Sequence, residues 1–105
     1  MVKRRKILVT TGTRAEYGIL RPLLKKIEMS KKLDLFLVVT GTHNSKKYGM
    51  TINEIKRDGF KISKILKILP KSDTPYSITQ SLGEGIIHFT KIFKKIKPDI
   101  NLILG

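Results

Sequence analysis

The residues best suited to chemistry lie at positions 7–18, which read Ile-Leu-Val-Thr-Thr-Gly-Thr-Arg-Ala-Glu-Tyr-Gly. An apolar run ends at Gly12, and Arg14 follows where a helix is expected to begin. In a parallel α/β sheet this corner lies at the carboxyl end of the first strand, where ligands bind. A helix start offers N–H groups without intrahelical partners, and a guanidinium suits phosphate oxygens. These residues therefore predict a phosphate-binding corner suited to a nucleotide.

Two common phosphate-binding motifs do not fit this corner. No Gly-Lys-Ser or Gly-Lys-Thr follows, which excludes a P-loop, and Gly12-Thr13-Arg14 lacks the second glycine of the dinucleotide fingerprint. No group of His, Asp and Glu residues has metal-ligand spacing, and no Ser or Cys nucleophile motif occurs. We therefore predict neither a metal site nor a cofactor.

Several other polar residues could touch a ligand, and each has a plain structural alternative. His43 follows the second expected strand at the same sheet edge as Gly12, so it could contact a substrate, shuttle a proton or bond to nearby backbone. Glu16 could bond a sugar or complement the helix dipole. Residues 72–73, Ser-Asp, could contact substrate or only end a loop, and His88 is interpreted as a packing or surface residue.

The elements that must position these residues alternate between strand and helix signals, which predicts a parallel, doubly wound sheet. The expected strands lie at 6–11, 33–40, within 60–69 and at 100–104, and the expected helices at about 15–30, 51–59 and 75–95. Thr51 and Glu54 fit a capping box, and Thr74-Pro75 fits an N-cap followed by proline. The predicted fold class is α/β, a Rossmann-like parallel sheet of about four strands with flanking helices.

Helical spacing predicts the buried faces of the two longer helices. The first face comprises Leu20, Leu23, Leu24 and Ile27, and the second comprises Ile78, Leu82, Ile86, Phe89 and Phe93. Pro22 is awkward inside the first helix, so regular helix is expected to begin later than Ala15. Gly83 and Gly85 in the second helix indicate close backbone packing, because each costs about 1 kcal/mol relative to alanine.

The composition is that of one small globular domain, with 105 residues of which 40% are hydrophobic. The absence of cysteine excludes disulfides and thiolate metal sites. The apolar runs are too short to span a membrane, and no signal-peptide core follows the basic start. These features predict a cytoplasmic protein without a membrane partner.

The formal net charge of +14 is large for this size. It indicates either an electropositive surface for nucleic acid or an anionic ligand, or a bias toward lysine and isoleucine of the kind found in heat-adapted proteins. The lysines are spread over the chain and are seldom interleaved with aromatic residues. Nucleic acid is therefore not the expected partner.

A set of short segments carries a family resemblance. They are Thr-Gly-Thr-Arg-Ala-Glu-Tyr-Gly at 11–18, Val-Thr-Gly-Thr-His at 39–43, Tyr-Gly-Met-Thr-Ile-Asn-Glu-Ile at 48–55, Asp-Gly-Phe at 58–60, Ser-Asp-Thr-Pro at 72–75, Lys-Pro-Asp at 97–99 and Leu-Ile-Leu-Gly at 102–105. In this order they resemble the N-terminal region of the UDP-N-acetylglucosamine 2-epimerases. The non-hydrolysing branch has proline at the position of Ala15, so the resemblance favours the hydrolysing branch.

The resemblance implies two facing Rossmann-like domains, the glycosyltransferase-B arrangement, with this chain forming part of the N-terminal domain. It implies that Arg14, Ala15 and Gly18 touch UDP, beside Gly12 and Thr13 at the same corner. The family reaction eliminates UDP from UDP-N-acetylglucosamine and adds water to give N-acetylmannosamine, a precursor of sialic acids. A UDP-sugar is therefore the expected ligand.

Residues 1–105 are expected to form a single partial Rossmann-like domain. The final glycine matches the one that precedes a catalytic Asp-Arg pair in the family. No catalytic residue is therefore expected within the chain, apart from a minor role for His43. Three alternatives remain open: an enzyme fragment that needs a second domain or forms a homodimer, a non-catalytic subunit that pairs with a separate C-terminal half, and a small basic nucleic-acid-binding protein.

Overall fold

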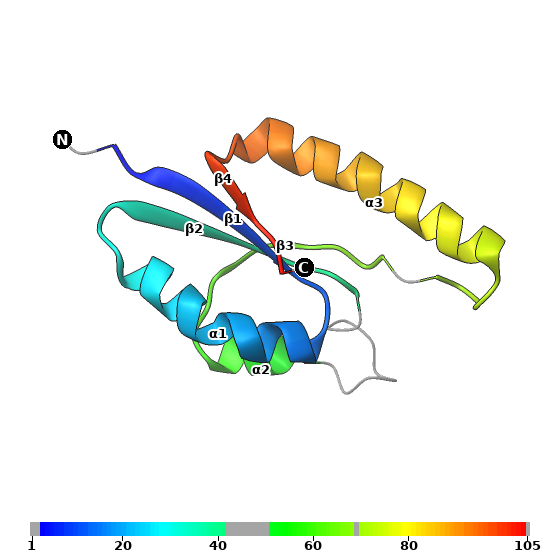
Figure 1. The fold of residues 1–105 in the computed structure, drawn as a ribbon, viewed down its shortest axis with the longest axis horizontal. Helices are drawn as coiled ribbons and strands as arrows, with labels where there is room; N and C mark the ends of the chain where they lie inside the picture. Colours follow the sequence, from blue (N-terminus) through cyan, green and yellow to red (C-terminus); the bar gives the residue numbers. More distant parts are fainter. Residues whose placement is uncertain (1–2, 42–50, 69, 105) are drawn as a thin grey trace.

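The computed structural model describes residues 3–41, 51–68 and 70–104. Helices and strands alternate along the chain, as the sequence pattern predicts (Figure 1). The elements are β1 (Arg5–Thr11), α1 (Arg14–Met29), β2 (Leu33–Val39), α2 (Ile52–Arg57), β3 (Ile62–Ile65), α3 (Pro75–Ile96) and β4 (Ile100–Leu102). The strand expected within 60–69 is confirmed, and β4 is two residues shorter than expected.

The four strands form one parallel sheet in the order β3-β2-β1-β4. β1 lies in the middle, and its residues Ile7, Leu8 and Val9 are buried because helices cover both faces of the sheet. The chain steps outward from β1 to β2 and β3, and then returns to place β4 on the other side of β1. The carboxyl end of β1 therefore lies at a topological switch point, where open α/β sheets bind ligands.

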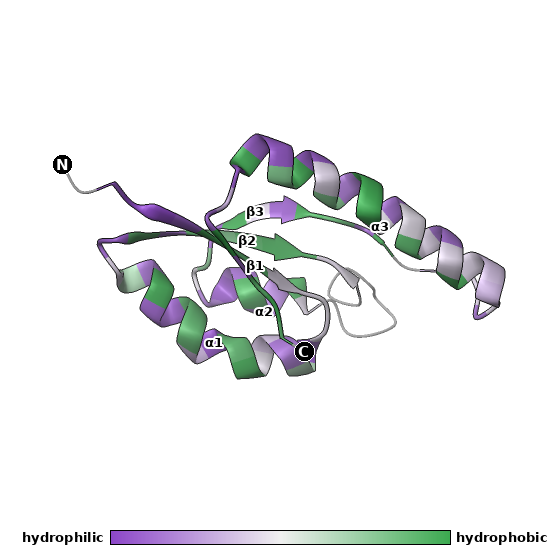
Figure 2. Ribbon diagram, turned by 45° about the horizontal axis from the view of Figure 1, so that its top comes forward, coloured by the Kyte–Doolittle hydropathy of each residue, from purple (hydrophilic) through white to green (hydrophobic). Residues whose placement is uncertain are grey.

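The two faces of the sheet carry separate hydrophobic cores. α1 and α2 cover one face, and α3 lies on the other (Figure 1). The core beneath α1 and α2 includes Val9, Leu24, Leu37 and Ile55. The smaller core beneath α3 joins Leu8, Val38, Leu66 and Ile92. Figure 2 shows hydrophobic residues along β2 and in bands that alternate with hydrophilic residues along α1.

The helix α1 begins at Arg14 and continues through Pro22, so the later start expected from this proline is wrong. Pro22 has no N–H to bond the carbonyl of Gly18, but both residues are exposed, so water can reach that carbonyl. The buried face is formed by Tyr17, Leu20, Leu24 and Ile27. Leu23, expected on this face, is 44% exposed because it is turned about 100° from Leu24 around the helix.

The predicted capping box at the start of α2 is wrong. Thr51 already has helical backbone angles, φ −56° and ψ −19°, and its side chain makes no capping hydrogen bond. Its backbone carbonyl accepts from the Glu54 amide at 2.9 Å. The Glu54 carboxylate is therefore available for a different partner.

The helix α3 starts as predicted, with Thr74 accepting from the Ser77 amide and Pro75 in the first turn. Its predicted buried stripe is largely exposed, at 50% for Ile78, 66% for Leu82, 62% for Ile86 and 36% for Phe93. Twenty-two residues of helix are about 33 Å long, whereas the seven residues of β1 span about 23 Å. Only the C-terminal half therefore packs on the sheet, through Phe89, Ile92 and Ile96.

The glycines of α3 do not mark the close backbone packing that the sequence predicts. A Cβ at Gly83 would meet nothing within 4 Å. A Cβ at Gly85 would make only an ordinary contact, 3.7 Å from the Ile68 side chain.

The end of α3 is joined to the start of β1. Lys6 donates its amide to the Asp99 carboxylate at 2.7 Å and accepts from the Asp99 amide at 2.9 Å. Its ammonium donates to the carbonyl of Ile96 at 3.0 Å. These bonds place β4 beside β1.

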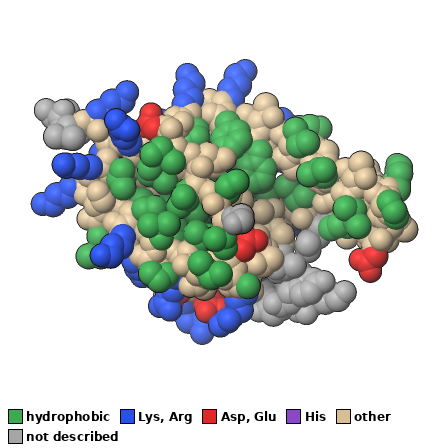
Figure 3. Space-filling model, viewed as in Figure 1, with side chains coloured by type: hydrophobic (Ala, Val, Ile, Leu, Met, Phe, Trp, Pro, Cys, Tyr) green, Lys and Arg blue, Asp and Glu red, His purple; other side chains and the backbone are tan. Residues whose placement is uncertain are grey.

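Large exposed hydrophobic side chains gather near β4 and along α3 (Figure 3). They include Ile100, Ile103 and Leu104 at the β4 end and Ile78, Leu82 and Ile86 on α3. We call these six residues the apolar surface. Neither α1 nor any other helix in the described part of the chain has the length and apolar character that crossing a membrane requires.

Candidate functional site

The candidate site is the corner formed where β1 and β2 end. The Thr40 amide donates to the Thr11 carbonyl at 3.0 Å, which holds the two strand ends together. Gly41 follows with φ +65°, and a Cβ there would lie 2.4 Å from the Gly12 carbonyl oxygen. Only glycine fits at position 41, because any side chain would push β2 away from the corner.

Thr13 caps α1 at this corner. Its hydroxyl accepts from the Glu16 amide at 3.2 Å, and its carbonyl accepts from the Tyr17 amide at 3.0 Å. Arg14 and Ala15 form the first residues of the helix. The first N–H groups of a helix have no intrahelical partner and lie at the positive end of its dipole, so this position favours an anion.

The Arg14 side chain is held toward α2 by Glu54. Its Nε lies 3.2 Å from Oε2 of Glu54, and its Nη2 lies 3.5 Å from Oε1. The side chain is still 72% exposed. A guanidinium has five N–H donors, so the two bonds to Glu54 leave others for a phosphate.

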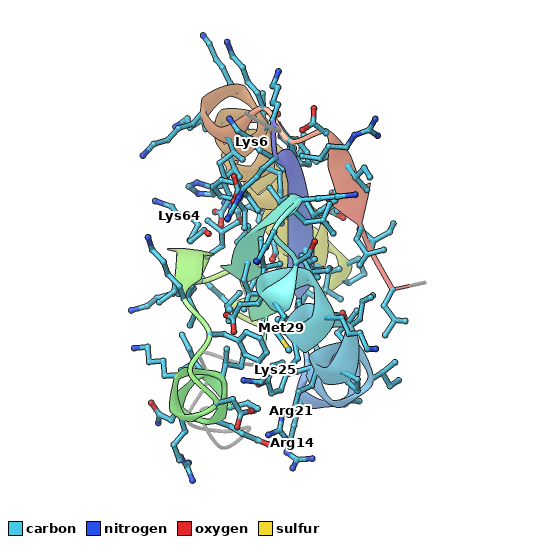
Figure 4. The ribbon with its side chains drawn as sticks, turned by 90° about the vertical axis from the view of Figure 1, so that its left-hand side faces the viewer. Lys6, Arg14, Arg21, Lys25, Met29 and Lys64 are labelled. Carbon is cyan, nitrogen blue, oxygen red and sulfur yellow. The ribbon has the colours of Figure 1, made fainter. Side chains whose placement is uncertain are left out.

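A second cluster, which the sequence analysis did not find, fixes α1 against α2. The Tyr17 hydroxyl donates to the Asp58 carboxylate, and Arg21 Nη2 donates to the other Asp58 oxygen at 3.2 Å. Lys25 donates to the Asp58 carbonyl at 2.8 Å and lies 4.5 Å over the Phe60 ring. Figure 4 shows Arg14, Arg21 and Lys25 along the same side of α1. The spacing of residues 17, 21 and 25 was a sequence signal for one helix face, but the partner on α2 was not readable from it.

The pKa of Tyr17 lies well above its ordinary value. Burial is the largest cause, followed by the hydrogen bond to Asp58 and the charge of that carboxylate. The hydroxyl therefore stays protonated and keeps donating to Asp58. This contact positions α2, and with it the Glu54 that holds Arg14.

The corner brings together four of the predicted site residues: Gly12, Thr13, Arg14 and Ala15. Glu16 is close to them, since its Oε1 would lie 3.6 Å from a Cβ at Gly12. Gly18 is on the exposed side of α1, where a Cβ would meet nothing within 4 Å.

The sequence analysis also named His43, His88 and residues 72–73 as candidates. His43 is outside the described residues. His88 lies on α3, across the sheet from the corner, and is exposed. Ser72 lies just before α3, where its amide donates to the Ser77 hydroxyl and its own hydroxyl bonds Thr74, so both bonds order the start of that helix. Within residues 3–41, 51–68 and 70–104, no three His, Asp or Glu side chains are grouped as metal ligands.

The parallel sheet, its switch point and the corner at the end of β1 define a Rossmann-like α/β domain with a ligand-facing edge. The family described as UDP-N-acetylglucosamine 2-epimerase matches residues 25–105. The chain belongs to this family, and the resemblance predicted from the motifs is confirmed.

Relatives and solved structures agree with this assignment. The chain is 41% identical to UDP-N,N'-diacetylbacillosamine 2-epimerase (hydrolyzing) of Legionella pneumophila, over 96% of this chain and 27% of that protein. It is 38% identical to GDP/UDP-N,N'-diacetylbacillosamine 2-epimerase (hydrolyzing) of Campylobacter jejuni, over 99% of this chain and 27% of that protein. A crystal structure of UDP-N-acetylglucosamine 2-epimerase matches with a TM-score of 0.75 and 26% identity, over 94% of this chain and 26% of that one.

The chain thus spans about a quarter of the length of these relatives. A structure of UDP-GlcNAc 2-epimerase from Neisseria meningitidis bound to UDP-GlcNAc has the same fold over 93% of this chain, with a TM-score of 0.71 and 21% identity. The predicted likeness to part of the N-terminal domain of a glycosyltransferase-B fold is confirmed by these neighbours.

Proposed function

We propose that this chain carries the UDP-contacting corner of a hydrolysing sugar-nucleotide 2-epimerase. The observation that carries the proposal is the position of Arg14, which is exposed in the first turn of α1 at the switch point of the sheet. A diphosphate there would meet both the guanidinium and the N–H groups of the helix start. The names of the Legionella and Campylobacter relatives, both described as hydrolysing enzymes acting on a nucleotide-linked amino sugar, support the same assignment.

The corner would contribute to the departure of UDP rather than to proton transfer. In the proposed reaction, a base removes the proton at C2 of the sugar, UDP leaves from C1, and water adds to the resulting glycal. The leaving diphosphate gains negative charge, which Arg14 and the helix dipole stabilise. In this proposal the base comes from polypeptide beyond residues 1–105, and the same corner serves either UDP-N-acetylglucosamine or a UDP-linked diacetamido sugar.

The apolar surface is an argument that further polypeptide packs on this chain in the proposed enzyme. Ile103 is 67% exposed and Leu82 is 66% exposed, and β4 pairs only with β1 among the strands that the structure describes. Exposed apolar patches of this kind mark surfaces that another element covers. In the proposed enzyme, polypeptide corresponding to the rest of its relatives' length covers this surface and supplies the second half of the cleft.

The test is a calorimetric titration of UDP into the purified chain and into an Arg14→Ala variant. Hydrogen bonds to charged groups contribute about 1.5–3 kcal/mol, so the variant is expected to bind roughly 10- to 150-fold more weakly. Arg57→Ala is the matched control, because Arg57 is an exposed arginine in the last turn of α2. Binding that both variants weaken equally, or that Arg14→Ala leaves unchanged, would contradict the assignment of the corner.

A further inference from the structure

A groove with a volume of about 360 Å³ lies between β3 and the C-terminal half of α3. It opens on the face of the sheet opposite α1 and α2, so it is separate from the corner at Arg14. Its floor is apolar and is formed by Phe36, Leu66, Ile92 and Ile96. All four belong to the core beneath α3, so the floor is fixed by packing.

Four lysines surround this floor. Lys61 and Lys64 line the groove from the β3 side, and Lys91 and Lys95 line it from α3. Figure 4 shows Lys64 on the side of β3 that is turned toward α3. Among the residues that the structure describes, none that lines the groove is acidic, and no ion pair engages any of the four lysines.

Four ammonium groups that have no ion-pair partner among the described residues surround one opening, and their like charges repel one another. An anion bound between them would relieve this repulsion, and the apolar floor beneath them would exclude water from the contact. A volume of about 360 Å³ falls in the range of small-molecule sites, which are mostly apolar with a few polar groups that orient the ligand. The groove has both parts of such a site, an apolar floor and a charged rim.

We propose that this groove binds a small amphipathic anion. The ligand has an aromatic or short aliphatic body that lies on Phe36 and Leu66. Its acidic group, a carboxylate, sulfonate or phosphate, lies at the lysine rim. This site is independent of the proposed nucleotide corner, and neither needs the other to be correct.

The test uses 8-anilinonaphthalene-1-sulfonate as the probe, titrated into the chain while its fluorescence is followed. The variant Lys64→Glu/Lys91→Glu is expected to bind this probe at least tenfold more weakly. The control Lys26→Glu/Lys31→Glu changes the net charge by the same amount at two exposed lysines on and just after α1, and is expected to change the affinity less than twofold. Equal weakening by both pairs, or weakening by neither, would overturn the proposal.

Two further measurements distinguish probe binding in the groove from probe binding on the apolar surface, which is also able to bind aromatic probes. N-phenyl-1-naphthylamine has the same rings without the sulfonate, and its affinity is expected to be unchanged by the Lys64→Glu/Lys91→Glu variant. Ser63→Trp fills the groove from β3 without changing its charge and is expected to reduce sulfonate-probe binding at least fivefold. Unchanged binding in Ser63→Trp, with unfolding by urea like that of the parent, would place the probe elsewhere and refute the site.

Discussion

Replacing Tyr17 with phenylalanine removes one hydroxyl from the contact that joins α1 to the end of α2. Tyr17 is 1% exposed, and its partner Asp58 keeps a side-chain exposure of 17% and a second bond from Arg21. A hydrogen bond to a charged group contributes about 1.5–3 kcal/mol. Because Arg21 and solvent still reach the carboxylate, we expect a loss near the lower end, about 1.5 kcal/mol in the free energy of unfolding.

The measurement is urea unfolding followed by circular dichroism, with Tyr76→Phe as the matched control. Tyr76 is 78% exposed, so deleting its hydroxyl is expected to change stability by less than about 0.5 kcal/mol. For a domain of this size, the expected loss in Tyr17→Phe corresponds to roughly 6–12 °C in Tm. Equal midpoints for the two variants would show that the Asp58 contact does not fasten α1 to α2.

The same contact predicts a dependence on alkaline pH. The pKa of Tyr17 is raised by burial and by Asp58, so the folded state keeps a proton that the unfolded state loses near pH 10. Stability from this group is therefore complete below about pH 10 and falls above it, by up to about 1.4 kcal/mol per pH unit. The advantage of the parent over Tyr17→Phe is expected to stay constant up to about pH 9 and to shrink between about pH 10 and about pH 12. A difference that stays constant over the whole range would contradict the cause assigned here.

Three further predictions test the packing and the corner. Leu24→Ala is expected to cost about 2–5 kcal/mol because Leu24 is fully buried, whereas Leu23→Ala costs under about 1 kcal/mol; equal urea midpoints would refute the assigned face of α1. Gly41→Ala is expected to destabilise the chain more than Gly59→Ala, because both have positive φ but only position 41 meets backbone; thermal melts that rank them in reverse would exclude the close approach. Glu54→Gln removes the ion pair with Arg14 and is expected to tighten UDP binding about 1.5- to 5-fold, which corresponds to the free energy of an exposed ion pair. Weaker binding by calorimetry would mean instead that Glu54 orients Arg14 for the ligand.

The strands and the site corner were readable from the sequence because local chemistry determines them. Buried parallel strands have continuous apolar runs, so β1 and β2 are predicted to within one residue at each end. The Gly12 turn and the N-cap at Thr74 depend on neighbouring residues alone, and both lie where the pattern places them.

The errors share one cause, which is that spacing does not say what lies opposite a helix. Leu82 and Ile86 match helical spacing, but α3 extends past the sheet and nothing in the described chain covers them. The capping box failed because Thr51 has helical backbone angles, and Glu54 bonds Arg14 instead, a residue 40 positions away. The Tyr17–Asp58 contact was missed for the same reason, since its two groups come from different helices.

The pairing of Lys6 with Asp99 joins residues 93 positions apart, and this separation governs how the fold can assemble. Contacts between distant residues require the closure of long loops, which slows folding. During synthesis from the N-terminus, β1 emerges first, yet one of its edges stays without a neighbour until β4 has left the ribosome. β1 is thus the first of the described strands to be made, but it gains its second neighbour only when residues 100–102 have emerged, so the nascent chain exposes an open strand edge to aggregation until then.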